Sequence, residues 1–199
     1  MAYVLNVDFG PIWDSVEVVK SYRALVDECN ALDAENAKKY ADYGEYGEKA
    51  IKEAKARTEA RRNEAAEFVQ ERLAENNKKF LAEIDKQVLL DGDQISLGDM
   101  ELLRSELIAN ENELKALQVR HASSPAMRRA IAKYAKNKNW PGFDDATNEG
   151  SLRAFADRFF RMCGYAPRNP NGYLAQAAIS PRVMYDMLAE FGINNVKAE

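Results

Sequence analysis

The stretch IKEAKARTEARRNE, Ile51 to Glu64, contains a single large apolar residue among charged side chains, alanines, one threonine and one asparagine. Most of these residues are strong helix formers, and from Glu48 to Leu90 the chain contains neither glycine nor proline. The sequence therefore predicts one long helix over residues 45–90, roughly 65 Å in length at about 1.5 Å per residue. A helix that is polar on all sides bridges solvent, is held by side-chain pairs or is unstable alone. We interpret its first half as a projecting segment that is available to a partner.

The second half of this helix differs, because it carries an apolar stripe at helical spacing. A second stripe follows over residues 97–121, where a and d positions are filled for three heptads. In a parallel homodimer of that segment Glu106 would face Glu111, so an antiparallel hairpin between the two stripes, turning at 91–96, is the preferred arrangement. Leu107→Asp should unfold such a hairpin, since it places an unpaired charge in the interface. The first stripe comprises Val69, Leu73, Phe80, Ile84 and Val88, and the second Met100, Leu103, Leu107, Asn110, Leu114, Leu117 and His121.

The N-terminal segment carries two further patterns. Alternating apolar residues from Tyr3 to Phe9 predict either one short strand or an extended arm packed on the protein's own helices, and both interpretations stay open. A stripe from Val18 to Leu32 then predicts a helix of about eighteen residues. Three tyrosines at Tyr40, Tyr43 and Tyr46 lie among the glycines of residues 40–47, which indicates a hinge. Such tyrosines either anchor an interface or form the edge of a core.

The C-terminal half predicts a compact helical module. Ser124-Pro125 and Ser180-Pro181 place serine and proline in the order preferred at helix starts, and another helix is expected over residues 151–164. The fold class is therefore all-α: a long charged helix in an antiparallel helical hairpin, a small C-terminal helical module and one N-terminal strand or arm. We divide the chain into an N-terminal arm and helix (1–44), the long helix and turn (45–96) and the C-terminal module (97–199).

The sequence gives no indication of catalysis, a metal site or a cofactor. His121 is the only histidine, and the two cysteines, Cys29 and Cys163, lie in apolar helical patterns typical of buried free thiols. No phosphate-binding loop, dinucleotide fingerprint or zinc-protease motif occurs. We therefore expect a non-enzyme without cofactors. The chain shows no signal peptide and no long apolar run, so we expect a cytoplasmic protein without membrane contacts.

Two sets of residues are candidate binding surfaces. Residues 120–140 contain six basic residues and no acid. On a helix over 125–139 these cations could contact nucleic-acid phosphates or an acidic partner, or they could form a solvated face that docks on the acidic first fifty residues. The basic candidates are Arg128, Arg129, Lys133, Lys136 and Lys138. The candidates for a protein interface are Tyr40, Tyr43, Tyr46, Phe68, Leu73 and Phe80.

In layout the chain resembles the small scaffold-like and virion-assembly proteins of tailed phages, which combine long Ala/Glu/Lys-rich helices with a small helical terminal module. The resemblance covers mainly residues 45–120. It implies a structural or assembly protein that forms oligomers or binds a protein partner, in the bacterial cytoplasm or in the virion. The alternative is a small binding module, either an anti-defence protein that inhibits a host complex or a nucleic-acid binder that uses helix 125–139.

Overall fold

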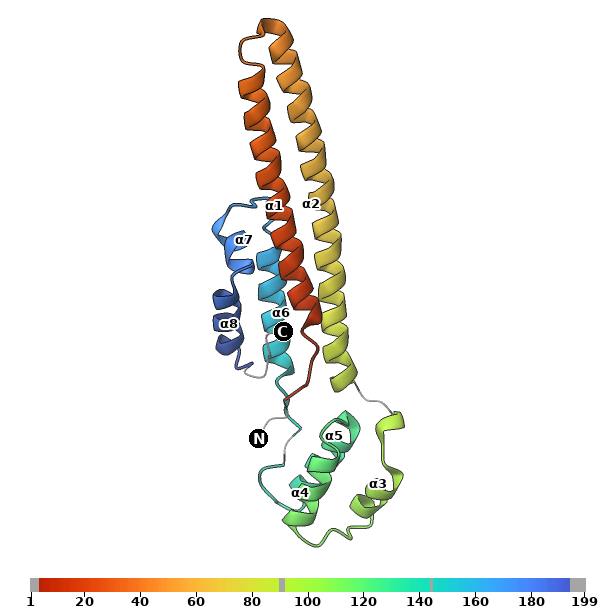
Figure 1. Cartoon of the computed structure of the whole chain (residues 1–199). Helices are drawn as coiled ribbons and strands as arrows, with labels where there is room; N and C mark the ends of the chain where they lie inside the picture. The colour runs from red at the N-terminus through yellow and green to blue at the C-terminus, as the bar shows by residue number, and fades with distance from the viewer. Residues whose placement is uncertain (1–3, 90–91, 144, 194–199) are drawn as a thin grey trace. The chain divides into compact units, whose positions relative to one another are not determined.

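The computed structural model describes residues 4–89, 92–143 and 145–193, and their regular elements are all helical (Figure 1). The predicted all-α class is therefore confirmed. These residues form no strand, and Thr147 alone takes part in an isolated β-bridge. The elements are α1 (Gly10–Lys39), α2 (Gly44–Val88), the 3-10 turn η1 (Gly92–Gln94), α3 (Leu97–Arg104), α4 (Glu111–Arg120), α5 (Pro125–Asn137), α6 (Glu149–Cys163), α7 (Tyr173–Ala178) and α8 (Pro181–Glu190).

The chain divides into two compact units. Unit 1 comprises Met1–Asp8 and Leu81–Arg153, and unit 2 comprises Phe9–Phe80 and Ala154–Glu199. The divisions fall inside α2 and inside α6, so they do not coincide with the predicted boundaries at 44/45 and 96/97.

In unit 2, α1 and the part of α2 up to Phe80 run side by side in opposite directions (Figure 1). The long helix is predicted correctly to within two residues at each end, but its hairpin partner is α1 and not residues 97–121. The polar stretch from Ile51 to Glu64 contacts α1 through charge pairs. Arg61 donates to both carboxylate oxygens of Glu28, at 3.0 and 3.1 Å, and Thr58 Oγ1 donates to Asp33 Oδ1 at 2.6 Å. Since these contacts are polar, an analysis of apolar stripes could not find them.

The predicted continuous helix over 97–121 is broken into α3 and α4. Asn110 accepts hydrogen bonds from the backbone N–H groups of Asn112 and Glu113, and Glu113 Oε2 accepts from Ala109 N, which completes a reciprocal cap. A strong N-cap here starts a new helix, and Glu106 turns the chain with a φ of 54°. Leu107 is therefore 68% exposed, and the expectation that Leu107→Asp unfolds the hairpin is wrong.

The N-terminal residues 4–9 form an extended arm and not a strand. Leu5 and Val7 are buried in unit 1, while Val4, Asn6 and Asp8 are exposed, so the alternation in the sequence is real. Side-chain amides satisfy the backbone: Leu5 N donates to Asn148 Oδ1 at 2.9 Å, and Asn6 exchanges two hydrogen bonds with the Gln87 amide. Because these amides replace a neighbouring strand, the arm needs no sheet. Tyr3 lies outside the described residues.

Phenylalanines join the elements of unit 2. Phe155 on α6 is the centre of this cluster, and its ring lies 6.0 to 6.4 Å from four other rings. These belong to Phe9, Phe80, Phe159 and Phe191. Both cysteines are free and fully buried, as predicted, and burial raises the pKa of the Cys163 thiol to about 12.

The core of unit 1 is formed by α3, α4 and α5, where α3 and α4 both pack against α5. Ser124 caps α5, since its Oγ accepts from Met127 N at 3.3 Å. The Tyr134 hydroxyl donates to Ile108 O at 3.1 Å, which ties the loop between α3 and α4 to α5. The core comprises Leu103, Ile108, Leu114, Leu117, Met127, Ile131, Tyr134, Ala135 and Phe143.

Candidate functional sites

The end of the α1–α2 hairpin, residues 40–47, presents tyrosine side chains to solvent, and we call it the hairpin tip. Tyr43 is 61% exposed and Tyr46 is 72% exposed, whereas Tyr40 is half-buried with its ring 6.0 Å from that of Tyr43. Gly47 allows the close turn, because a Cβ there would lie 2.2 Å from Tyr40 O. The predicted hinge is thus a tight turn between two helices, and two of the three tyrosines point outward.

The half of the hairpin next to the tip buries almost nothing. From residue 30 to residue 57, which we call the distal half, Gly47 is the only buried residue. The half-buried positions recur at steps of three and four along each side of the hairpin, so they face the other helix. They are Asp33, Asn36, Ala37 and Tyr40 before the turn and Ala50, Ile51 and Ala54 after it. Partly buried side chains and the Asp33–Arg62 ion pair therefore hold the two helices together here, without a fully buried apolar core.

The other predicted interface residues divide between surface and core. Phe68 on α2 is 61% exposed, and it stays a candidate contact. Leu73 and Phe80 are 5% and 0% exposed, so both belong to the core of unit 2 and are not available to a partner. Their spacing in the sequence is that of a packed face, and Phe80 packs on Phe155 of α6 and on Phe9, the residue before α1.

A polar network crosses from α1 to α2 in the same unit. Asn76 is buried, and its amide donates to Asp14 Oδ2 at 2.8 Å and to Ser15 Oγ at 3.0 Å. Arg72 Nε donates to the same Asp14 oxygen at 3.0 Å. The Asn76 hydrogen bond, with help from Arg72, holds the pKa of Asp14 below its usual value. Asp14 is therefore an ionised partner that joins α1 to Asn76 and Arg72 of α2.

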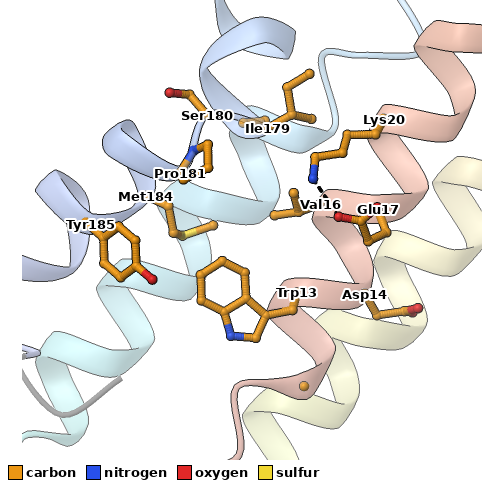
Figure 2. Close-up of a pocket in the computed structure, with 12 residues that line it drawn as sticks. Trp13, Asp14, Val16, Glu17, Lys20, Ile179, Ser180, Pro181, Met184 and Tyr185 are labelled. Carbon is orange, nitrogen blue, oxygen red and sulfur yellow. Dashed lines mark hydrogen bonds and ion pairs between the residues drawn. The ribbon is translucent and has the colours of Figure 1, made fainter. Parts of the chain in front are cut away.

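A pocket that the sequence did not indicate lies beside this network, between the start of α1 and the turn from α7 to α8 (Figure 2). Its volume is about 530 Å³. The rings of Trp13 and Tyr185 lie 6.4 Å apart at its wall, and Lys20 pairs with Glu17 at 2.6 Å on its rim. Asp14 points away from Trp13 toward α2 (Figure 2). The pocket thus offers apolar contact with its charges already paired, and its walls come from segments too distant in sequence for spacing to reveal it.

The structure divides the five basic candidates of unit 1. Arg128 is 4% exposed, and its guanidinium donates to Ala122 O at 2.9 Å and to Gln87 O at 3.2 Å. It therefore stabilises the C-terminal end of α2 and is not part of an open surface. Lys138 pairs with Glu106 at 2.5 Å, and this contact raises the pKa of Lys138.

Arg129, Lys133 and Lys136 are the exposed members of the basic set. They line a shallow hollow of about 540 Å³ on unit 1. The opposite wall of the hollow comes from the turn after α5 and includes Trp140 and Phe143. In the sequence these three cations stand at helical spacing, and Tyr134 and Trp140 follow as residues that could stack on bases. In the structure the three cations and Trp140 line the same hollow.

His121 belongs to a structural contact. It follows the last residue of α4, and its Nε2 lies 2.7 Å from Asp99 Oδ2 at the start of α3. The same carboxylate pairs with Arg120, and the hydrogen bond from His121 is the largest cause that lowers the pKa of Asp99. Asp99 N also donates to the capping Ser96 Oγ at 3.3 Å. The contact joins the end of α4 to the start of α3.

Among the described residues, no group of histidine, cysteine, aspartate and glutamate side chains could hold a metal ion. Within the same part of the chain, none of the helices combines the length and the apolar character that crossing a membrane requires. Comparison of the chain with protein-family models, with curated proteins and with solved structures finds no match. A function must therefore be argued from the surfaces described above.

Proposed function

We propose that the protein is a non-enzymatic assembly protein whose hairpin tip and distal half bind a second copy of the chain. The observation that carries the proposal is the distal half itself, in which Gly47 alone is buried while Tyr43 and Tyr46 are exposed at the tip. Exposed tyrosines at the end of a rigid element are typical of interface anchors, because they bury a large area with little loss of side-chain entropy.

Charge does not oppose contact between copies. Residues 30–57 contain six acids and six bases, distributed along both helices. A surface of mixed sign that carries no net charge can pair with another copy of itself without long-range repulsion. The assembly function is also the one that the resemblance to virion-assembly proteins of tailed phages implies, and it is the basis on which we propose a location in a bacterial cell or a virion.

Sedimentation velocity of the full chain over a range of concentrations tests the proposal. The wild type should form dimers or larger species as its concentration rises, because association depends on protomer concentration. The double variant Tyr43→Ser/Tyr46→Ser should weaken association at least tenfold, which corresponds to about 1.4 kcal/mol.

Tyr173→Ser is the matched control, since Tyr173 on α7 is 80% exposed and lies outside the hairpin. It should associate like the wild type. A wild-type protein that remains monomeric at every concentration would contradict the proposal. Equal loss of association in the control and in the tip variant would place the interface elsewhere.

A further inference from the structure

The hollow on unit 1 has a line of cations along one wall. Arg129, Lys133 and Lys136 follow one another on α5 at steps of four and three, so their side chains project from one face of the helix. The helix itself, PAMRRAIAKYAKN, contains no acid. Three positive charges therefore stand within about two turns of a helix that contains no acid.

Among the described residues, Asp145 is the acid that pairs with one of these cations. Arg129 Nε lies 3.7 Å from Asp145 Oδ2, and both side chains are more than half exposed, so solvent screens the pair. Lys133 and Lys136 form no ion pair with any residue in the described parts of the chain. The nearby Glu106 is already engaged by Lys138. The wall thus keeps most of its charge for a ligand.

The aromatic wall is fixed in place. The Trp140 ring packs edge-to-face on Tyr134, with centroids 6.0 Å apart, and Trp140 N donates to Ala135 O at 2.9 Å. Gly142 turns the chain with a φ of 84°, and Phe143 beside it is buried in the core of unit 1. Trp140 is half-buried and lines the hollow beside the three cations. Its indole ring is therefore immobilised in a position where a base could stack on it.

We propose that this hollow binds single-stranded nucleic acid, with phosphates on Arg129, Lys133 and Lys136 and a base against Trp140. A row of cations beside an immobilised aromatic ring is the arrangement by which proteins hold a single strand without reading its sequence. An acidic peptide would use the cations but would leave the indole without a stacking partner. This site is independent of the hairpin tip and of self-assembly.

Three phosphate contacts give a defined dependence on salt. For a single strand the slope of log affinity against log salt is about −0.7 per contact, so three contacts lower the affinity roughly 20-fold between about 50 and 200 mM salt. Fluorescence anisotropy of the full chain with a labelled oligothymidylate of about 20 nucleotides measures this dependence. We expect measurable binding at about 50 mM salt and an affinity roughly 20-fold lower at about 200 mM salt.

Two variants with the same change in charge separate a local site from a general charge effect. Lys133→Glu/Lys136→Glu should reduce affinity at the lower salt concentration by 30-fold or more. Lys78→Glu/Lys115→Glu alters two exposed lysines on α2 and α4 that do not line the hollow, and it should change the affinity less than threefold. If the wild type does not bind the oligonucleotide, or if both variants lose the same amount of affinity, the proposal is wrong.

Trp140 reports stacking directly. The chain has two tryptophans, so a Trp13→Phe background leaves Trp140 as the single indole emitter. Oligothymidylate should quench this emission at saturation. Polyglutamate of equal charge should bind at least tenfold more weakly and should not quench it. If polyglutamate binds as tightly, or if emission does not change with the oligonucleotide, the surface is one for acidic proteins and the proposal is wrong.

Discussion

Asp33 is the residue that best explains how a polar segment can pair with a neighbouring helix. It accepts a hydrogen bond from Thr58, which is one of the few buried polar residues, and it pairs with Arg62. The Thr58 hydrogen bond is the largest cause that lowers the pKa of Asp33 below its ordinary 3.8, and Arg62 adds to it. The ionised form is therefore favoured by folding.

The sign of the resulting pH dependence follows from that direction. A carboxyl group with a lower pKa in the folded state adds stability that is fully present above its unfolded pKa. This stability is lost as pH falls through the ordinary value of 3.8 toward the folded value. We predict that Asp33→Asn lowers the free energy of unfolding at about pH 7, and that the difference from the wild type shrinks below about pH 4.

Urea denaturation at several pH values measures this difference. Glu35→Gln makes the same kind of change at an exposed position of α1, and it should leave the unfolding free energy close to that of the wild type at every pH. A gap between Asp33→Asn and wild type that stays constant down to about pH 3 would show that the Asp33 carboxylate contributes nothing through its charge.

The break between α3 and α4 determines which leucines of this segment contribute to the stability of unit 1. Leu107 lies in the loop between them and is 68% exposed, while Leu114 on α4 is fully buried. We predict that Leu107→Asp changes the free energy of unfolding by less than about 0.5 kcal/mol. Leu114→Asp should cost more than about 4 kcal/mol or prevent folding, because it buries an unpaired charge.

Thermal and chemical denaturation monitored by circular dichroism compare these two variants. A large loss of stability in Leu107→Asp would mean that the segment is helical and packed, as the heptad spacing alone suggests. Leu114→Ala provides a folded comparison if Leu114→Asp does not fold, with an expected cost of about 2–5 kcal/mol.

The same elements indicate what the sequence could predict. Helix existence followed from composition and capping: α2, α5 and α8 begin where glycine, serine and proline place them. The pairing of residues 51–64 did not follow, because Thr58 and Arg61 contact Asp33 and Glu28 of α1, and polar partners leave no apolar period in the sequence. The heptads of 97–121 misled for the converse reason, since a local cap at Asn110 outweighs a weak stripe.

The candidate sites show the same limit. The cations of the basic face were found by counting charges, but Arg128 turned out to be buried because the end of α2 offers it a carbonyl oxygen. The Trp13–Tyr185 pocket could not be found, since its two rings belong to residues far apart in the chain. The burial of Arg128 and the position of the pocket both depend on residues that are distant in sequence, and no local sequence pattern shows such neighbours.

The whole molecule has two compact units with separate cores, so we expect each unit to open without the other. Phe155 is the centre of the phenylalanine cluster in unit 2, and Leu114 is a core residue of unit 1. Phe155→Ala should cost about 3–5 kcal/mol through the cavity it leaves. We predict that it speeds amide hydrogen exchange in residues 10–39 more than in residues 111–137.

Leu114→Ala should give the reverse pattern, with faster exchange in residues 111–137 first. Hydrogen exchange followed by mass spectrometry of peptides resolves the two regions. Uniform acceleration across both regions by either substitution would mean that the protein unfolds as one cooperative body and that the two units do not open separately.

The order in which these units can be completed during synthesis follows from how the chain is shared between them. Unit 2 needs residues on both sides of the segment 81–153 to complete its phenylalanine cluster. Within that segment Arg153 pairs with Asp85, so the two ends of the segment lie close together in folded unit 1. Once unit 1 has folded, the nascent chain has a much shorter loop left to close, and the entropic cost of joining early and late residues of unit 2 falls accordingly.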